Sequence, residues 1–454
     1  MSQKKSNVSF ITNANINKVI FKISIPLMIS NLIKTFYGIT DGIYVAQISS
    51  EDYAATSFTW PITFLFIAFG LGINVAATSL MSQRLGGGRI EEAKVYARHT
   101  LVLTAIIGIL FSIVGYLIAP FIVRWMGAEG SFAYKSQLFL AINSIGLIFD
   151  LIFFGYQAIL NAQGLTKSIT IISTISSLTN VILDPFFIFD NVLGLPGLNL
   201  GLKGAAYATV LSKVLLVIIA VKLVNKESEI EVRLRDFNYQ PKIIRDIFQI
   251  AVPASLGTSG EAIGFIILNG FIQSYGTTTL AAFSMGNRLS DIFNQASMGI
   301  GMALTSIIGQ NVGANNKKRA KAIFKRANII ITIFSLLAAI ILLSFKDPLL
   351  SIFIKDKNDV ELWRQASEYM YFSAAITFFM GYFSAINGFF QGLGQTKFTM
   401  YLNLGRLWLF RLPTIIILKN LTNLGSTGIW IAMLLSNALT VLWGFIIYLK
   451  KTDL

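Results

Sequence analysis

Apolar runs of about 20 residues recur along the whole chain, and they constrain its fold more than any other feature. A helix needs about 20 mostly apolar residues to cross a bilayer. Runs of this kind lie at 101–123, 138–160, 168–190, 328–345, 371–390 and 427–448. Because lipid offers the backbone no hydrogen-bonding partners, each run must be helical. The sequence therefore predicts an all-α polytopic membrane protein.

Composition supports this fold class. Of the 454 residues, 54% are hydrophobic and 13% are charged, whereas a soluble chain carries roughly 25% charged residues. The net charge of +15 would suggest nucleic acid in a soluble protein. Lysine and arginine also collect in the cytoplasmic loops of membrane proteins, so no nucleic-acid partner is expected. The absence of cysteine and the single histidine, His99, argue against thiol chemistry and a multi-histidine metal site.

About twelve membrane helices are predicted. Lysine and arginine residues gather in every second connection between helices, so the positive-inside rule places both termini in the cytoplasm. The sequence therefore predicts a multi-pass protein of the cell inner (plasma) membrane. The predicted helices are 19–48, 53–82, 94–123, 132–160, 168–190, 201–224, 243–273, 279–309, 319–345, 362–391, 396–419 and 425–449.

The two halves of the chain repeat each other. Pro26 in SIPLMIS matches Pro253 in AVPASLG, an offset of 227 residues (26 to 253), and Gln83 matches Gln310 at the same offset. Each half has an even number of helices, so two six-helix bundles related by a pseudo-two-fold axis along the membrane normal are expected, an arrangement that suits alternating access. The predicted segments are a cytoplasmic 1–18, a bundle 19–224, a cytoplasmic linker 225–242, a bundle 243–449 and a tail 450–454.

Ionisable groups at bilayer depth mark functional sites by default. Asp41 lies in the first helix, within GITDGIYVA, and is predicted to bind H⁺ or Na⁺. Asn180 and Asp184 are four residues apart in LTNVILDPFF, so they share one helix face. Pro185 frees a carbonyl one turn earlier. The side-chain oxygens of Asn180 and Asp184 and the freed carbonyl oxygen form a candidate binding site for a hard cation. The alternative is that Asp184 merely ends the helix before Pro185.

Glu261 lies in the seventh helix, within SGEAIGF, and no charge in its own helix neutralises it. It is expected to take up and release protons, or to bind substrate. Lys34 is its repeat equivalent (34 plus 227 is 261) and lies seven residues before Asp41. Lys34 is therefore expected to pair with Asp41 or with Glu261, or else to reach an interface. A fixed positive charge there would favour protons over Na⁺.

Other charges lie in apolar surroundings. Asp150 in LIFDLIFF is either a further proton site or is neutralised by a neighbouring helix. Arg288 with Asp291, and Arg406 with Arg411, are expected to pair locally or to face a polar cavity.

The chain resembles the multidrug and toxic compound extrusion (MATE) family over residues 15–450. The resemblance rests on SIPLMISNLIKTFYGITDGIYVA, GLGINVAATSLMSQRLGGG, NAQGLTK, TNVILDPFFIF, GLKGAAYATVLS, AVPASLGTSGEAIGF and GIGMALTSIIGQNVGA. It implies twelve helices in two bundles, and exchange of Na⁺ or H⁺ for cationic or amphiphilic organic compounds.

The resemblance also implies roles for particular positions. Asp41 matches the first-helix aspartate of the family, and Asn180 with Asp184 matches its fifth-helix pair. The resemblance implies that they form the amino-terminal cation site, with Na⁺ as one candidate ion. Tyr37 is expected near that site, and Thr209 in the sixth helix and Glu261 in the seventh are implied as further site residues. A conformational role is expected for Pro26, where the first helix can bend, and for Pro185.

The chain departs from the family in one helix. The branch that uses the seventh-helix glutamate also needs a tenth-helix aspartate, and YMYFSAAITFFMGYFSAING has none. A complete carboxy-terminal Na⁺ site is therefore not expected.

The predicted function is a cation-coupled (H⁺ or Na⁺) antiporter that exports organic cations or amphiphiles, without a cofactor. Its partners are the small-molecule substrate and the bilayer, and a monomer is expected to suffice because two halves already enclose a central cleft. Two alternatives remain. One is a lipid-linked oligosaccharide flippase of the same superfamily, and the other is a non-transporting membrane receptor or enzyme, for which no catalytic motif is present.

Overall fold

The computed structural model describes residues 7–354 and 359–451, most of them in helices. The amino-terminal half contains α1 (Val8–Asn13), α2 (Ile16–Ile48), α3 (Ser50–Gly86), α4 (Ile90–Trp125), α5 (Gly130–Ile145), α6 (Leu147–Ala162), α7 (Thr166–Ile188), the antiparallel strands β1 (Asn191–Val192) and β2 (Leu195–Pro196), and α8 (Leu202–Glu227).

The 3-10 turn η1 (Leu234–Asp236) lies between the halves. The carboxy-terminal half contains α9 (Pro241–Gln273), α10 (Thr277–Gly313), α11 (Lys317–Ser344), α12 (Lys346–Ser351), α13 (Val360–Gly392), α14 (Thr396–Leu404), the π-helix η2 (Gly405–Arg411), α15 (Leu412–Leu421) and α16 (Ser426–Lys451).

The predicted all-α membrane architecture is confirmed. Each predicted helix coincides with one span of the structure, although the ends differ by a few residues. The fourth span is α5 with α6, interrupted at Gly146, and the eleventh is α14, η2 and α15 together. Within the described residues, 11 spans are long and apolar enough to cross a membrane. The remaining span, α10, is more polar, since it carries side chains such as Asn287 and Asp291.

The predicted segments outside the bundles are partly described. Residues 1–6 of the segment 1–18, and residues 452–454 of the tail, lie outside the described residues. The rest of the first segment forms α1 and the start of α2. The connection between α8 and α9, predicted over 225–242, runs from 228 to 240.

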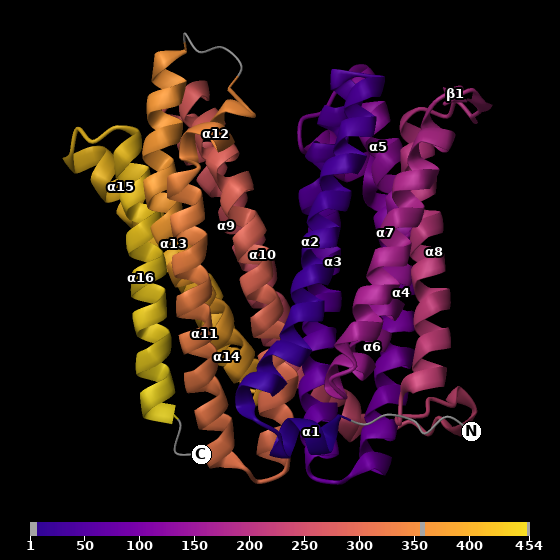
Figure 1. Ribbon diagram of the computed structural model, residues 1–454. Helices are drawn as coiled ribbons and strands as arrows, with labels where there is room; N and C mark the ends of the chain where they lie inside the picture. The colour runs from indigo at the N-terminus through magenta and orange to yellow at the C-terminus, as the bar shows by residue number, and fades with distance from the viewer. Residues whose placement is uncertain (1–6, 355–358, 452–454) are drawn as a thin grey trace.

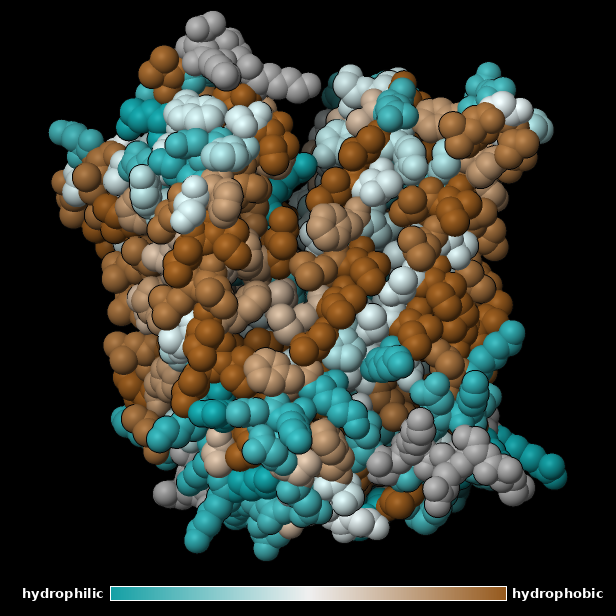
Figure 2. All heavy atoms as spheres, viewed as in Figure 1, coloured by the Kyte–Doolittle hydropathy of each residue, from teal (hydrophilic) through white to brown (hydrophobic). Residues whose placement is uncertain are grey.

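The helices form two bundles side by side, α2 to α8 in one and α9 to α16 in the other (Figure 1). The helix α1 and the end of α16 lie at the same end of the molecule, which is called the termini end below. Figure 2 shows hydrophobic residues around the middle of the molecule and hydrophilic residues gathered at the termini end. At the opposite, far end, the surface is hollowed between the bundles.

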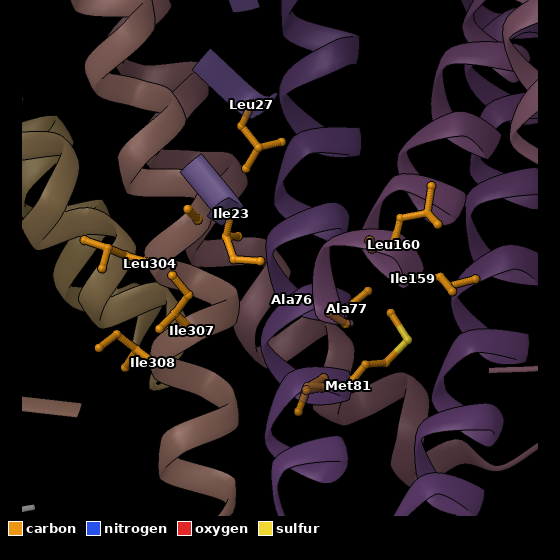
Figure 3. Close-up of a cluster of buried hydrophobic side chains, with 14 of the residues drawn as sticks. Ile23, Leu27, Ala76, Ala77, Met81, Ile159, Leu160, Leu304, Ile307 and Ile308 are labelled. Atoms are coloured by element: carbon orange, nitrogen blue, oxygen red, sulfur yellow. The ribbon is translucent and has the colours of Figure 1, made fainter. Parts of the chain in front are cut away.

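One hydrophobic cluster joins the two bundles towards the termini end (Figure 3). It includes buried residues of α2, α3 and α6 from one bundle and of α10 from the other, namely Ile23, Leu27, Ala76, Ala77, Met81, Ile159, Leu160, Leu304, Ile307 and Ile308. Because lipid tails are as apolar as leucine, close van der Waals packing drives such contacts in a membrane.

Two glycines bring the halves into direct backbone contact at the termini end. A Cβ at Gly86 of α3 would overlap the carbonyl oxygen of Gln310 in α10. A Cβ at Gly313 of α10 would overlap the carbonyl oxygen of Gln83 in α3. Both pairs have the same repeat offset of 227 residues (83 to 310, 86 to 313). The two contacts are therefore one contact repeated by the pseudo-two-fold axis.

The side chains of the same two glutamines cross between the bundles. Gln83 Nε2 donates to the carbonyl of Gly392 at 2.9 Å, and Gln310 Nε2 donates to the carbonyl of Ala162 at 2.6 Å. Each acceptor ends the fourth span of the opposite half, so the hydrogen bonds obey the same symmetry. Residues Gln83, Gly86, Gln310 and Gly313 are called the glycine–glutamine contact below.

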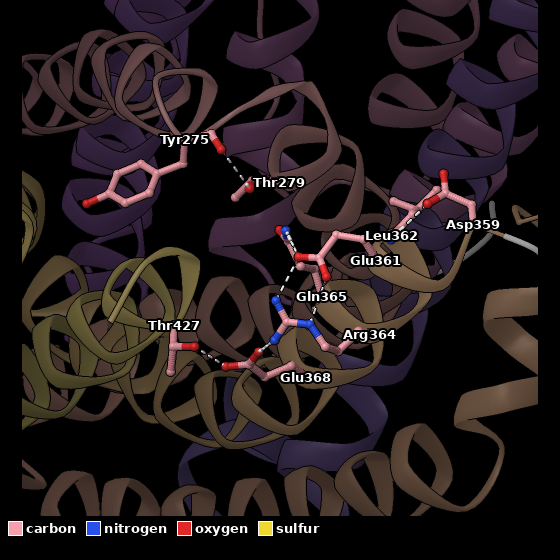
Figure 4. A network of polar contacts seen from close by, with 9 residues as sticks. All are labelled: Tyr275, Thr279, Asp359, Glu361, Leu362, Arg364, Gln365, Glu368 and Thr427. Carbon is pink, nitrogen blue, oxygen red and sulfur yellow. Dashed lines mark hydrogen bonds and ion pairs between the residues drawn. The ribbon is translucent and has the colours of Figure 1, made fainter. Parts of the chain in front are cut away.

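A polar network holds α13 to α16 at the far end of the carboxy-terminal bundle (Figure 4). Arg364 forms ion pairs with Glu361 at 2.7 Å and Glu368 at 3.5 Å, and Thr427 of α16 donates to Glu368. Gln365 donates to Glu361 at 2.7 Å. These contacts stay within one bundle, whereas the glycine–glutamine contact joins the two.

We predict that Gly86→Ala loosens the glycine–glutamine contact, because the added methyl group has no room beside Gln310. Ser82→Cys provides a reporter at this interface, since Ser82 is fully buried and the native chain has no cysteine. A polar maleimide added from the termini side is expected to label the reporter several-fold faster in Gly86→Ala. The control is Gly270→Ala, because no atom lies within 4 Å of a Cβ there. Equal labelling rates in the two folded variants would contradict this account.

Candidate functional site

Two carboxylic acids from different helices meet in the amino-terminal bundle. Asp184 near the end of α7 is fully buried, and the side chain of Asp41 in α2 lies within hydrogen-bonding reach of it. Within the described residues, Oδ1 of Asp41 is buried without a hydrogen-bond partner. Two ionised carboxylates so close would repel each other. The pair therefore needs a proton or another cation.

The helix α7 continues through Pro185 to Ile188, so Asp184 does not simply end it. Proline has no N–H, and the carbonyl of Val181, one turn earlier, loses its helical partner. Pro26 also lies inside a continuous helix, α2, and its carbonyl accepts a hydrogen bond from Thr170 Oγ1 of α7 at 2.6 Å. The proposed conformational role of these prolines stays a prediction.

Three more predicted residues surround the acids. With its amide nitrogen towards Asp184, Asn180 donates to Oδ2 at 2.8 Å, and its oxygen accepts from the Thr209 N–H at 3.3 Å. We assign this orientation because it satisfies both ends of the amide. The side chain of Tyr37 lies near that of Thr209. The structure thus brings Tyr37, Asp41, Asn180, Asp184 and Thr209 together, and their role in cation coupling stays a prediction.

Asp150 has a partner that the sequence prediction missed. Lys213 Nζ in α8 lies 2.7 Å from Asp150 Oδ2, and the two side chains are 18% and 15% exposed. The charge of Lys213 also acts on Asp41. Lys213 lies one turn after Thr209, so its spacing already placed it on the helix face of the site. Asp150 is therefore neutralised by a neighbouring helix, one of the two alternatives above.

Lys34 lies near the same acid. Asp150 is the carboxylate whose charge acts on Lys34, and Lys34 Nζ lies 5.9 Å from the ring centre of Phe153. Neither expected ion pair of Lys34, with Asp41 or with Glu261, occurs within the described residues. The chain instead places Asp150 near two lysines, Lys34 and Lys213.

The carboxy-terminal bundle contains a second charged cluster. Glu261 of α9 forms an ion pair with Arg406 of η2. The side chain of Arg406 is 1% exposed and that of Glu261 is 23% exposed. Glu261 therefore pairs with Arg406 of another helix rather than with Lys34, the partner considered from the sequence. A buried arginine and carboxylate each need an opposite charge, and here the partner comes from a helix far along the chain.

The π-helix η2 explains why Arg406 and Arg411 are both internal. Hydrogen bonds in a π-helix run from residue i to i+5, so residues five apart lie on one face. The two arginines are 1% and 2% exposed. Arg411 Nε donates to Ser436 Oγ at 3.0 Å. Single π turns occur often at functional sites.

A conventional metal site does not occur in the described part of the chain. Within residues 7–354 and 359–451, no group of three or more histidine, cysteine, aspartate or glutamate side chains could hold a metal ion. The role of Asp41, Asn180 and Asp184 as a Na⁺ site stays a prediction.

We predict that Lys213→Met destabilises the protein, because it leaves Asp150 as a nearly buried, unpaired carboxylate. Breaking such a pair costs about 3 kcal/mol. The double variant Lys213→Met with Asp150→Asn is expected to recover most of the melting temperature in detergent. If the double variant melts no higher than Lys213→Met, the two groups are not an energetic pair.

Comparison with known proteins places this architecture in a family. The MatE family model matches the chain twice, over residues 26–186 and 253–417, so its two copies begin at Pro26 and Pro253. The probable multidrug resistance protein NorM of Thermotoga maritima is 22% identical over 423 residues, covering 92% of this chain and 89% of that protein. The FAD transporter of Shewanella oneidensis is 27% identical over 351 residues, covering 77% of each chain.

A solved structure has the same fold. The outward-facing conformation of a multidrug resistance MATE family transporter of the MOP superfamily superposes with a TM-score of 0.91 at 24% sequence identity, covering 99% of this chain and 100% of that chain. The two family matches cover most of both bundles and begin at the repeat positions. This chain therefore belongs to the MatE family of multidrug and toxic compound extrusion transporters.

Proposed function

We propose that this protein is a proton-coupled antiporter that exports amphiphilic organic compounds across the cell inner membrane. The observation that carries the proposal is the contact between Asp41 and Asp184. Two acids on different helices can share a proton, and loss of that proton makes them repel each other. Protonation of the pair would therefore change how α2 packs against α7.

The surroundings of the acids favour a proton over Na⁺. Lys213 acts on Asp41, and both Lys213 and Lys34 lie near Asp150. The positive charges of these lysines weaken the binding of a Na⁺ ion beside them. Na⁺ also needs several oxygen ligands, and the oxygen of Asn180 accepts a hydrogen bond from Thr209. A proton needs only the two carboxyl groups.

The arrangement of the bundles suits alternating access. The glycine–glutamine contact closes the termini end, and the surface is hollowed between the bundles at the far end (Figure 2). With the basic termini end in the cytoplasm, this conformation faces outward. Rocking of the two bundles about the midplane would open the termini end.

The relatives support an amphiphilic cargo. Similar proteins are named for multidrug resistance and for FAD transport, and FAD combines aromatic rings with charged groups. The chain has 36 phenylalanines, and aromatic faces can hold such rings. The charged clusters lie inside bundles rather than in a catalytic domain, which supports transport rather than catalysis.

We predict that Asp41→Asn and Asp184→Asn each lower proton-driven export at least tenfold, because a single acid cannot share a proton with an amide in the same way. Export of a fluoroquinolone from proteoliposomes, under an imposed pH gradient and separately under a Na⁺ gradient, measures this. The control is Asp190→Asn, an exposed aspartate just after α7. Export that follows the Na⁺ gradient in the wild type, or unchanged export by Asp41→Asn, would contradict proton coupling at this pair.

A further inference from the structure

The carboxy-terminal bundle holds two buried arginines against one carboxylate. Arg406 pairs with Glu261 and also lies 3.5 Å from Asn437 Oδ1. Arg411 contacts the hydroxyl of Ser436, and within the described residues no carboxylate forms an ion pair with it. When all three groups are ionised, the cluster of Glu261, Arg406 and Arg411 has an excess of one positive charge.

No further ion pair among the described residues neutralises Arg411. Tyr369 of α13 lies near enough for the charges of both Arg411 and Asp291 to act on it. Asp291 accepts from Asn287 at 3.4 Å, and no ion pair joins it to Arg411 within the described residues. An unbalanced guanidinium inside a membrane is costly, so its retention favours a ligand that supplies the missing charge.

The cluster also has aromatic neighbours and one partly exposed member. The guanidinium carbons of Arg406 and Arg411 lie 5.8 and 5.9 Å from the ring centre of Phe265, and Arg406 lies 4.6 Å from that of Phe383. The arginines themselves are buried, whereas Glu261 is 23% exposed. A ligand would therefore reach the arginines past Glu261, and the rings of Phe265 and Phe383 would lie beside it.

The amino-terminal cluster has the opposite excess. Its three acids, Asp41, Asp150 and Asp184, face two lysines, Lys34 and Lys213. One added cation neutralises that cluster, and one added anion neutralises the cluster around Arg411. The two bundles thus offer complementary sites.

We propose that Glu261, Arg406 and Arg411 form a binding site for the anionic group, a carboxylate or phosphate, of the exported amphiphile. The guanidinium fork matches either group through paired N–H donors. The anion would contact Arg411 and compete with Glu261 for Arg406. This inference rests on the proposed export function and narrows its substrates to amphiphiles that carry a negative group.

A binding experiment tests the site without any gradient. The probes are a rhodamine with a free carboxylate and its methyl ester, which differ only in the anionic group. Their dissociation constants for the purified protein in detergent are measured by fluorescence anisotropy. The wild type is expected to bind the carboxylate dye more tightly, and Arg411→Gln to weaken that binding at least tenfold while the ester changes less than twofold.

Matched variants separate binding from folding. Arg411→Lys is expected to retain part of the preference, because it keeps the charge without the fork. Arg124→Gln removes an exposed arginine at the end of α4 and is expected to bind both dyes as the wild type does. Equal binding of the two dyes by the wild type, or equal weakening of both by a folded Arg411→Gln, would overturn the proposal.

Two further arms distinguish the sources of the anion and the two proposals. In the first arm, inorganic phosphate or phosphatidylglycerol is added to the protein with each dye bound. If either one displaces the ester dye as strongly as it displaces the carboxylate dye, a substrate site is contradicted. Transport of the same dyes in phosphatidylcholine vesicles tests export separately. If the wild type binds the carboxylate dye through Arg411 but does not move it under a pH gradient, the export function fails and the anion site stands.

Discussion

Charges inside this membrane protein must find partners, because lipid supplies none. The chain meets this constraint with pairs that join different helices. Lys213 of α8 neutralises Asp150 of α6, and Glu261 of α9 neutralises Arg406 of η2. With all groups ionised, the cluster of Asp41, Asp150, Asp184, Lys34 and Lys213 has one negative charge in excess. The cluster of Glu261, Arg406 and Arg411 has one positive charge in excess. The proposed coupling and substrate sites both depend on these unbalanced charges.

The two sites lie in bundles that are related by the sequence repeat and joined by one symmetric contact. Gln83 with Gly86 and Gln310 with Gly313 repeat one contact about the pseudo-two-fold axis at the termini end. The bundles pack at that end and separate at the other (Figure 1). Opening the termini end must break the glycine–glutamine contact and its hydrogen bonds together. A symmetric contact of this kind favours a concerted change between two conformations over gradual opening.

Much of the fold could be predicted from the sequence, because apolar runs and a constant repeat offset are local or periodic signals. Asp41, Asn180 and Asp184 could also be singled out from the sequence, since Asn180 and Asp184 share a helix face and Asp41 is an isolated acid in an apolar helix. Tyr37 and Thr209 were implied only by the resemblance to the family. The charge partners were not. Glu261 and Arg406 are 145 residues apart (261 to 406), and no periodicity connects them. Arg406 and Arg411 share a face because η2 is a π-helix. In an α-helix, residues five apart would lie on different faces.

Proton release on substrate binding tests the central claim most directly. If the exported compound and the proton bind opposing conformations, linkage requires substrate to expel the proton from the acid pair. A pH indicator in weakly buffered detergent should then report about one proton released per transporter saturated with substrate, and no release from Asp41→Asn. Substrate binding without proton release in the wild type, or equal release in Asp41→Asn, would contradict the account.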